Sequence, residues 1–325
     1  MEYHRIGDTD LNVSRLCVGC MNFGDSASPE ESRRIIDAAL DTEINFFDTA
    51  NVYNEREGEK LLGETLTGRR DRAVIATKVQ APQFEENVPD HGTWIKEQCE
   101  ASLRRLRSDY IDLYQLNWPQ DDTPPEGVLD ALEALMDAGK VRAIGWSTIA
   151  PWQAVEFNFR AREEGRRPFV SIQFPYHPLD RRAERELIPM GKRHMGAMLA
   201  WGPLAGGFLA GKYSPRDGKT KDWRWGITED HFKPEAFRIL ETLREIAARH
   251  ACSPARIAMA WCAGSEGVTN VIAGPRTAEH LEEYIRGMNL ELDAGERAMI
   301  DEAAPAGGHT VPYLIADLGP GKFFW

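Results

Sequence analysis

The stretch INFFDTANVYNEREGEKLLGETL (residues 44–66) shows the pattern from which the fold can be predicted. A mostly apolar run from Ile44 to Phe47 ends abruptly at Asp48, as a buried strand ends when it reaches the rim of a sheet. Tyr53 follows on the loop, and the segment after it, rich in Glu and Lys, has the character of a helix. A strand followed directly by a helix is the repeating unit of α/β folds.

This unit recurs along the chain, because short apolar runs of the kind found in doubly buried parallel sheets alternate with amphipathic stretches. The eight predicted strands are RLCVGC (15–20), INFFD (44–48), AVIATK (73–78), YIDLYQLN (110–117), RAIGWST (142–148), FVSIQF (169–174), AMLAW (197–201) and NVIAG (270–274). They predict an α/β fold, a single (β/α)₈ TIM barrel over residues 1–325. A doubly wound sheet is the rival, but CVGCMNFG lacks the G-x-G-x-x-G spacing that usually follows its first strand.

Three segments add detail to the barrel. MEYHRIGDTDLNVS (1–14) has the pattern of two short strands about a Gly-Asp turn, and we expect a hairpin that caps the barrel floor. Ser28, Pro29 and Glu31 have the spacing of a helix start with a capping box. Residues 202–234 form a long irregular stretch after the seventh strand, and a loop of that length inside a compact domain usually has a function.

Composition excludes several classes of protein. The net charge of −12 argues against a nucleic-acid backbone as the main partner, and no window is apolar enough to span a membrane. Five scattered cysteines and a charged N-terminus fit a reduced, cytoplasmic setting. The C-x-x-C of Cys17 and Cys20 lies inside a strand pattern, so we interpret both as buried small residues, and no group of residues has metal-ligand spacing.

The chemistry-bearing residues fall where a barrel places its active site, at the C-terminal ends of the strands. Asp48 ends the second strand, with Tyr53 on the loop beyond, and Lys78 ends the third. Each has an ordinary structural reading, as a strand cap, a packed aromatic or a rim charge. Together they form a coherent proton donor, because a nearby ammonium lowers the pKa of a phenol and a carboxylate holds that ammonium charged and oriented.

The sequence resembles the aldo-keto reductase family over essentially its whole length. The matching motifs are MEYHRIGDTDLNVSRL, FFDTANVYNEREGEKLLGE, ATK, DYIDLYQLNWP, GKVRAIGWST, PLAGGFLAGKY and VIAGPRTAEHLEE. The resemblance implies a (β/α)₈ barrel that binds NADP(H), or else NAD(H), across its top, with a C-terminal loop over the active site. It also implies a small-molecule carbonyl or alcohol as substrate.

The resemblance also implies a role for each strand-end residue. Tyr53 is expected to be the proton donor, Lys78 its pKa modulator, Asp48 the partner of Lys78, and Asn117 the fourth catalytic residue. Trp201 is expected to stack on the nicotinamide, and Arg276 to receive an adenosine 2′-phosphate beside the start of the last barrel helix. The remaining expected cofactor contacts are Ser147, Thr148, Gln173, Gly202, Pro203, Leu204, Gly206, Lys212, Gly274, His280, Glu283 and Tyr284.

Three positions depart from the family pattern. Asn117 replaces the usual His in LNWP, Thr148 replaces the usual Asn, and Tyr284 ends a helix motif that usually ends in Asn. Asn117 still hydrogen-bonds, but it cannot relay a proton. The same Asn occurs in the branch with potassium-channel β subunits, which the chain also resembles. The alternatives are therefore a cofactor-binding regulator with slow turnover, or a sugar or polyol dehydrogenase acting mainly oxidatively.

Overall fold

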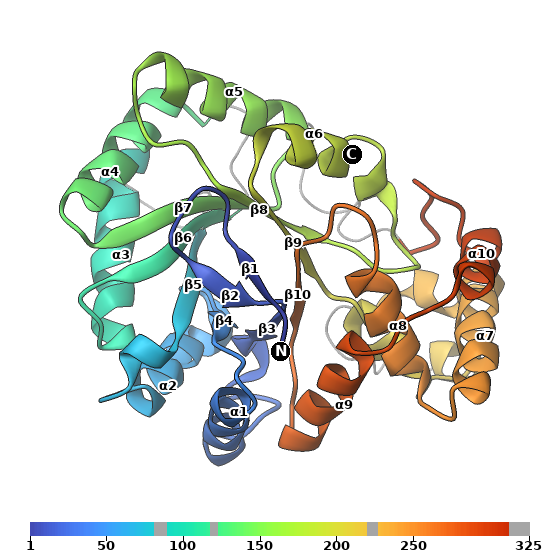
Figure 1. Ribbon diagram of the computed structural model, residues 1–325. Coiled ribbons are helices and arrows are strands. Elements are labelled where there is room, and N and C mark those ends of the chain that lie inside the picture. The colour runs from blue at the N-terminus through green and yellow to red at the C-terminus, as the bar shows by residue number, and fades with distance from the viewer. Residues whose placement is uncertain (81–89, 118–122, 220–226, 312–325) are drawn as a thin grey trace.

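The computed structural model describes residues 1–80, 90–117, 123–219 and 227–311. Its strands close into a parallel barrel in the order β10-β3-β4-β5-β6-β7-β8-β9 (Figure 1). They are β3 (Leu16–Gly19), β4 (Phe46–Asp48), β5 (Val74–Gln80), β6 (Ile111–Asn117), β7 (Val141–Ser147), β8 (Ser171–Pro175), β9 (Ala197–Trp201) and β10 (Asn270–Ala273). All eight predicted strands are confirmed, and the closed barrel excludes the doubly wound sheet.

Helices surround the barrel (Figure 1). They are α1 (Pro29–Asp41), α2 (Glu57–Thr65), α3 (His91–Leu106), α4 (Pro125–Asp137), α5 (Pro151–Glu163), α6 (Leu187–His194), α7 (Pro234–Arg249), α8 (Pro254–Ala263), α9 (Ala278–Met288) and α10 (Ala294–Ala303). None of those in the described ranges is both long and apolar enough to cross a membrane.

The capping box predicted at the start of α1 is only half formed. The Ser28 side chain accepts a hydrogen bond from the Glu31 backbone N–H at 3.2 Å, as an N-cap does. The reciprocal bond of a capping box is not formed. The Glu31 carboxylate instead accepts a hydrogen bond from the backbone N–H of Ala278, at the first residue of α9.

The N-terminal hairpin closes one end of the barrel, as predicted. β1 (Tyr3–Arg5) and β2 (Asn12–Ser14) pair antiparallel and lie across the barrel in Figure 1. Ile6, Leu11 and Val13 are buried in one cluster with inward-facing residues of the barrel strands. The hairpin therefore supplies the apolar floor of the interior, and the polar inward-facing residues lie above it. The predicted C-terminal loop falls in residues 312–325, outside the described residues.

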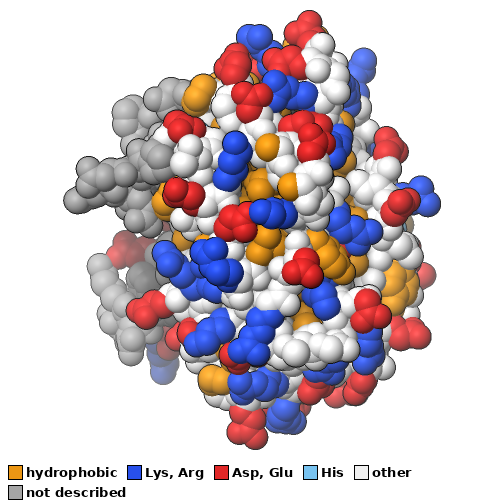
Figure 2. All heavy atoms as spheres, turned by 90° about the vertical axis from the view of Figure 1, so that its left-hand side faces the viewer, with side chains coloured by type: hydrophobic (Ala, Val, Ile, Leu, Met, Phe, Trp, Pro, Cys, Tyr) orange, Lys and Arg blue, Asp and Glu red, His pale blue; other side chains and the backbone are white. Residues whose placement is uncertain are grey.

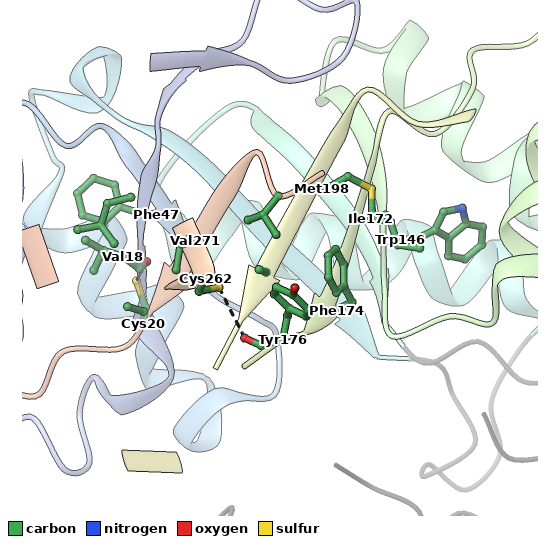
Figure 3. Packing of buried hydrophobic residues seen from close by; sticks show 14 of the residues in the cluster. Val18, Cys20, Phe47, Trp146, Ile172, Phe174, Tyr176, Met198, Cys262 and Val271 are labelled. Carbon is green, nitrogen blue, oxygen red and sulfur yellow. Dashed lines mark hydrogen bonds between the residues drawn. The ribbon is translucent and has the colours of Figure 1, made fainter. Parts of the chain in front are cut away.

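Side chains on the outer face of the strands form the larger core, between barrel and helices. Figure 3 shows part of it, including Phe174, Tyr176 and Cys262, whose Sγ donates to the Tyr176 carbonyl at 3.6 Å. Trp146 stacks on a neighbouring phenyl ring, that of Phe169, with centroids 4.0 Å apart. Burial on both faces explains why the strands are continuously apolar in sequence.

The cysteine pair behaves as small buried residues, as predicted. Cys17 belongs to the cluster inside the barrel and Cys20 to the cluster outside it, and both thiols are free. Burial raises the pKa of both well above the ordinary thiol value, with a smaller contribution from Asp48. Neither is therefore a nucleophile at neutral pH.

The outer face formed by α2, α3 and α4 carries charges of both signs (Figure 2). A hollow of about 420 Å³ between α2 and α3 is lined by Arg56, Lys60, Ala101, Arg104, Arg105 and Arg107. Three of these cations are paired with carboxylates of α2, and the pairs are Lys60–Glu57, Arg105–Glu59 and Arg107–Glu64. None of the predicted strand-end residues lines this hollow, so we assign it no role in the site.

The close fit of the hairpin predicts a large effect at Gly196. A Cβ there would lie 2.0 Å from the Gly7 Cα, so Gly196→Ala must displace backbone and should lower the free energy of unfolding by about 1–3 kcal/mol. Gly127, in α4, is the matched control, because a Cβ placed there meets no described atom within 4 Å apart from its chain neighbours and the backbone of its own helix. Gly127→Ala should raise stability by about 0.5–1 kcal/mol. Urea denaturation measures both, and equal effects would contradict the proposed fit.

Candidate active site

Asp48 and Lys78 form a buried ion pair at the upper end of the barrel interior. The Lys78 ammonium donates to Asp48 Oδ1 and, at 2.9 Å, to the Thr49 carbonyl. Asp48 is 3% exposed and Lys78 is 1% exposed. The loop after β4 follows β5 closely, since Thr49 N donates to the Ala76 carbonyl and Asn51 N to the Lys78 carbonyl. This pairing carries the chain from Asp48 toward Tyr53.

Tyr53 begins a strained turn. Asn54, Glu55 and Arg56 all have positive φ, at 46°, 53° and 78°, a conformation in which residues other than glycine are uncommon. The Asn54 side-chain amide donates to the carbonyls of Met21 and Phe23, at 2.7 and 2.8 Å, and so ties the turn to the loop after β3. Strain held by specific hydrogen bonds is typical of functional sites.

The phenol and the ammonium lie together, as predicted. Lys78 Nζ is 5.1 Å from the centroid of the half-buried Tyr53 ring. Loss of water around the Tyr53 hydroxyl raises its pKa more than the Lys78 charge lowers it, so the pKa is raised overall. The expectation of a lowered value is therefore wrong for the protein alone. Burial alone would lower the pKa of Lys78, but the Asp48 and Tyr53 groups raise it by a larger amount. The pKa of Lys78 is therefore raised overall, and Lys78 stays charged.

The ends of β6, β7 and β8 bring the next predicted residues side by side. Asn117 is in register with Ser147, and Ser147 with Gln173. Gln173 is 3% exposed, and its amide Nε2 donates to Asp48 Oδ2 at 2.8 Å. Thr148 has φ 56°, which is strained for a β-branched residue, and its N–H donates to the Gln173 carbonyl. The Asn that is usual in the family tolerates this conformation better.

The predicted contacts after β9 lie on one irregular segment. Trp201 ends β9 and is only partly buried. Gly202 and Gly206 have positive φ, at 70° and 64°, which glycine adopts without strain. Pro203 is buried, whereas Leu204 is partly exposed and Lys212 is exposed. A partly exposed indole followed by a glycine-rich turn leaves room for a ligand to approach the backbone.

The predicted contacts after β10 are only partly free to meet a ligand. Gly274 is exposed and Arg276 is half-buried, and no described carboxylate is paired with Arg276. His280 and Tyr284 lie one turn apart on α9, with near-parallel rings 6.4 Å between centroids. Glu283 is already engaged, because Arg256 donates to its Oε2 at 2.7 Å and Ser253 donates to its Oε1.

The start of α9 differs from the expectation of a free anion site. The Ala278 N–H donates to the Glu31 carboxylate at 2.8 Å, and the His280 N–H donates to the Thr277 hydroxyl at 3.3 Å. Glu31 therefore already supplies a negative charge to the positive end of this helix.

Two residues of the site are missed by the prediction from sequence. The Gln115 amide donates to Asp48 Oδ2 at 3.0 Å, and Asn22 Nδ2 donates to the Gly274 carbonyl at 2.9 Å. The prediction considered polar residues at the end of each strand, starting from the second strand. Gln115 lies inside its strand and Asn22 follows the first strand, so neither was considered. A signal was present for both: Gln115 is polar within an apolar strand and two residues before Asn117, and Asn22 directly follows the first strand.

The chain matches a known family in sequence as well as in overall structure. Residues 15–305 match the model of the "Aldo/keto reductase family". This chain belongs to the aldo/keto reductase family. Family members are oxidoreductases that use nicotinamide cofactors, with small carbonyl compounds or alcohols as substrates.

Relatives of this aldo/keto reductase cover nearly its full length. "Uncharacterized oxidoreductase YrpG" of Bacillus subtilis (strain 168) is 33% identical over 97% of this chain and 100% of its own length. "Protein tas" of Escherichia coli (strain K12) is 30% identical over 93% and 97%, respectively. The solved structure of "aldo-keto reductase AKR11C1 from Bacillus halodurans (holo form)" is 32% identical, with a TM-score of 0.75 over 94% of this chain and 97% of that one.

The buried ion pair predicts strong coupling between its two members. Lys78→Met leaves a buried carboxylate without its cation and should lower the free energy of unfolding by about 3–5 kcal/mol. The double variant Asp48→Asn/Lys78→Met should lose less than the sum of the two single losses, because neither charge is then left alone. Urea denaturation at neutral pH gives all the values.

An exposed pair on α2 is the control for this cycle. Lys60 Nζ lies 2.9 Å from Glu57 Oε1, and both side chains are about half exposed to solvent. Lys60→Met should leave stability nearly unchanged, because water screens such pairs. Additive losses at Lys78 and Asp48 would show that the buried pair contributes no coupling energy.

Proposed function

We propose that this protein is an NADP(H)-dependent, cytoplasmic aldo-keto reductase that reduces the carbonyl group of a small molecule with Tyr53 as the proton donor. The observation that carries the proposal is the convergence of Asp48, Lys78 and Tyr53 at the end of the barrel where TIM-barrel enzymes react. Membership of the family supplies the reaction class. Five free cysteines support the assigned compartment.

The three residues divide the work of proton transfer. A phenol keeps its proton at neutral pH, and the raised pKa of Tyr53 reinforces this, so its Oη has a proton to donate to a carbonyl oxygen. Lys78 carries a permanent positive charge beside the phenol, which stabilises the phenolate left after transfer. Asp48 and the Thr49 carbonyl hold that ammonium in place. A reduced nicotinamide, when bound, supplies the hydride to the carbonyl carbon.

The barrel top has the groups that such a cofactor needs. Ser147, Thr148 and Gln173 would hold the carboxamide, and the partly exposed Trp201 would stack on the nicotinamide ring. The turn at Gly202–Gly206, with Pro203 and Leu204, would take the pyrophosphate together with Lys212. Gly274 and Arg276 would receive the adenosine end, with His280, Glu283 and Tyr284 alongside on α9. The Gly202 position is open, since no described atom lies within 4 Å of a Cβ built there.

Asn117 would contact the substrate rather than transfer a proton. Its amide both donates and accepts hydrogen bonds, but it has no titratable group at neutral pH. It lies at the end of β6, beside Ser147 in the sheet register. The proton-donating role therefore falls to Tyr53 alone, and we expect a polar substrate that presents a hydroxyl beside its carbonyl.

Glu31 favours a second candidate cofactor, NAD(H). Its carboxylate accepts from Ala278 N, two residues after Arg276, and pairs with Arg34 at 2.7 Å, so a partly compensated negative charge already lies near the place proposed for a 2′-phosphate. Like charges repel, whereas a ribose 2′-hydroxyl could donate a hydrogen bond to a carboxylate. We therefore expect cofactor preference to depend on the balance of charge among Arg276, Glu31 and the Arg34 paired with it.

Tyr53→Phe tests the proposed donor. The variant keeps the ring but loses the transferable proton, so reduction of a panel of carbonyl compounds should fall at least about a hundredfold while NADPH binding is retained. Tyr114→Phe is the matched control, since Tyr114 is a buried tyrosine on the outer side of β6 whose hydroxyl donates to the Ile95 carbonyl. Activity near wild type in Tyr53→Phe would place the proton donor elsewhere.

Paired substitutions test the choice of cofactor. Arg276→Ala should weaken NADPH binding by about tenfold and leave NADH nearly unaffected, because a guanidinium gains its strong bond from phosphate. Glu31→Gln should strengthen NADPH relative to NADH, since the shape remains and the repelling charge is lost. Calorimetric titration with each cofactor gives the ratio. Equal changes for both cofactors in Arg276→Ala would show that this residue does not read the phosphate.

A further inference from the structure

Gln115 is an amide buried in the barrel where apolar side chains would be expected. It lies in the middle of β6, is 0% exposed, and is in register with Lys78 on β5 and Gly145 on β7. Burying an amide is costly unless its polar atoms find partners. The partners of Gln115 are residues of the proposed site.

The amide of Gln115 bridges two site residues. Its Nε2 donates to Asp48 Oδ2 at 3.0 Å, and its Oε1 accepts from Gln173 Nε2 at 3.2 Å. Gln173 Nε2 also donates to the same Asp48 oxygen at 2.8 Å. The three side chains therefore form a closed triangle of hydrogen bonds.

The charge of Asp48 sets the direction of every bond in this triangle. An ionised carboxylate only accepts, so both glutamines must turn their NH₂ groups toward it. The Oε1 atom of Gln173 is then the end of that amide left to accept a hydrogen bond from a bound molecule, and no described residue donates to it. A nicotinamide carboxamide offers an NH₂ group that suits this acceptor.

The neighbouring strand leaves space for this arrangement. A Cβ at Gly145 would lie 3.3 Å from Gln115 Cγ and 2.2 Å from Ser171 Oγ. Any larger residue at position 145 would therefore push on the Gln115 side chain. Gly145 leaves the room, and the hydrogen bonds hold the amide in it.

We infer that Gln115 is a positioning residue for the proposed reduction, an inference that rests on the proposed function. It holds Asp48 and the amide of Gln173 in one fixed arrangement. Through Asp48 it orients Lys78 beside Tyr53, and through Gln173 it presents the acceptor for the carboxamide. The proton-donating group and the cofactor-binding amide are thus aligned by one side chain that touches neither substrate nor cofactor.

Two substitutions at this position separate positioning from packing. Gln115→Leu keeps the approximate volume but removes both polar atoms. We expect it to weaken cofactor binding several-fold and to lower kcat/KM by about tenfold or more, the range for a lost hydrogen bond to a charged group. Gln115→Glu keeps the shape and the acceptor but replaces the donor that faces Asp48.

The pH dependence of Gln115→Glu is the decisive measurement. The introduced carboxyl group can donate to Asp48 only while it is protonated, and two carboxyl groups that share a site hold a proton to higher pH. The activity of this variant relative to wild type should therefore rise as the pH is lowered from 8 toward about 5.5. A purely structural role would not produce this recovery.

Asn158→Leu is the matched control, because it also removes a buried amide with two partners. Asn158 lies on α5, donates to the Phe169 carbonyl at 3.2 Å and to Met195 Sδ at 3.3 Å, and accepts from Phe169 N at 2.9 Å. The Asn158→Leu variant should be less stable than wild type, but its kcat/KM per folded molecule and the pH profile of that value should be unchanged. Circular dichroism confirms that each variant is folded before it is assayed.

The outcomes distinguish the inference from the function on which it rests. An active wild type, an impaired Gln115→Leu and an acid-restored Gln115→Glu support the inference. An active wild type with cofactor affinity and kcat/KM of Gln115→Leu within twofold overturns it and leaves the proposed function standing. A wild type that binds cofactor but reduces no carbonyl in the panel overturns the proposed function, and the inference falls with it.

Discussion

The ion pair between Lys78 and Asp48, buried at the mouth of the barrel, is the interaction on which the site depends. Two charges taken out of water are costly unless each finds further partners. Asp48 accepts hydrogen bonds from the amides of Gln115 and Gln173, and Lys78 donates one to the Thr49 carbonyl. Asp48 is separated along the chain by 30, 67 and 125 residues from Lys78, Gln115 and Gln173, respectively. These four residues lie on β4, β5, β6 and β8, and the fold of the barrel brings the other three side chains to the Asp48 carboxylate.

The rigidity of this centre is matched by strain in the segments around it. Asn54, Glu55 and Arg56 follow Tyr53 with positive φ, and Thr148 follows Ser147 in the same conformation. Each such residue costs on the order of 1–3 kcal/mol and persists only where its surroundings hold it. The Asn54 amide bonds and the Thr148 N–H bond are such restraints. The strained residues in the loops after β4 and β7 therefore lower the stability of the fold.

Electrostatics at the far end of the site depend on different residues. The first turn of α9 is met by Glu31 from the start of α1, 247 residues away in the chain, while Arg276 lies just before the helix. The two opposite charges border the region proposed for the adenosine end of the cofactor. Family membership defines the reaction class, and under the proposed function we expect this local balance of charge to set the preference between the two forms of the cofactor.

The amino-acid pattern alone was enough to predict the barrel and the residues at its rim. Continuous apolar runs are typical of strands buried on both faces, so all eight strands could be predicted, and Asp48, Lys78 and Tyr53 were predicted to lie together because strand ends and the loops after them meet at one rim. The remaining features depend on how the elements pack. The Tyr53 pKa is raised because burial outweighs the nearby ammonium, and Gln115 joins the site because register places it opposite Lys78. Solvation, register and contacts such as Glu31 with α9 exist only once distant segments are packed together, and local sequence patterns do not encode them.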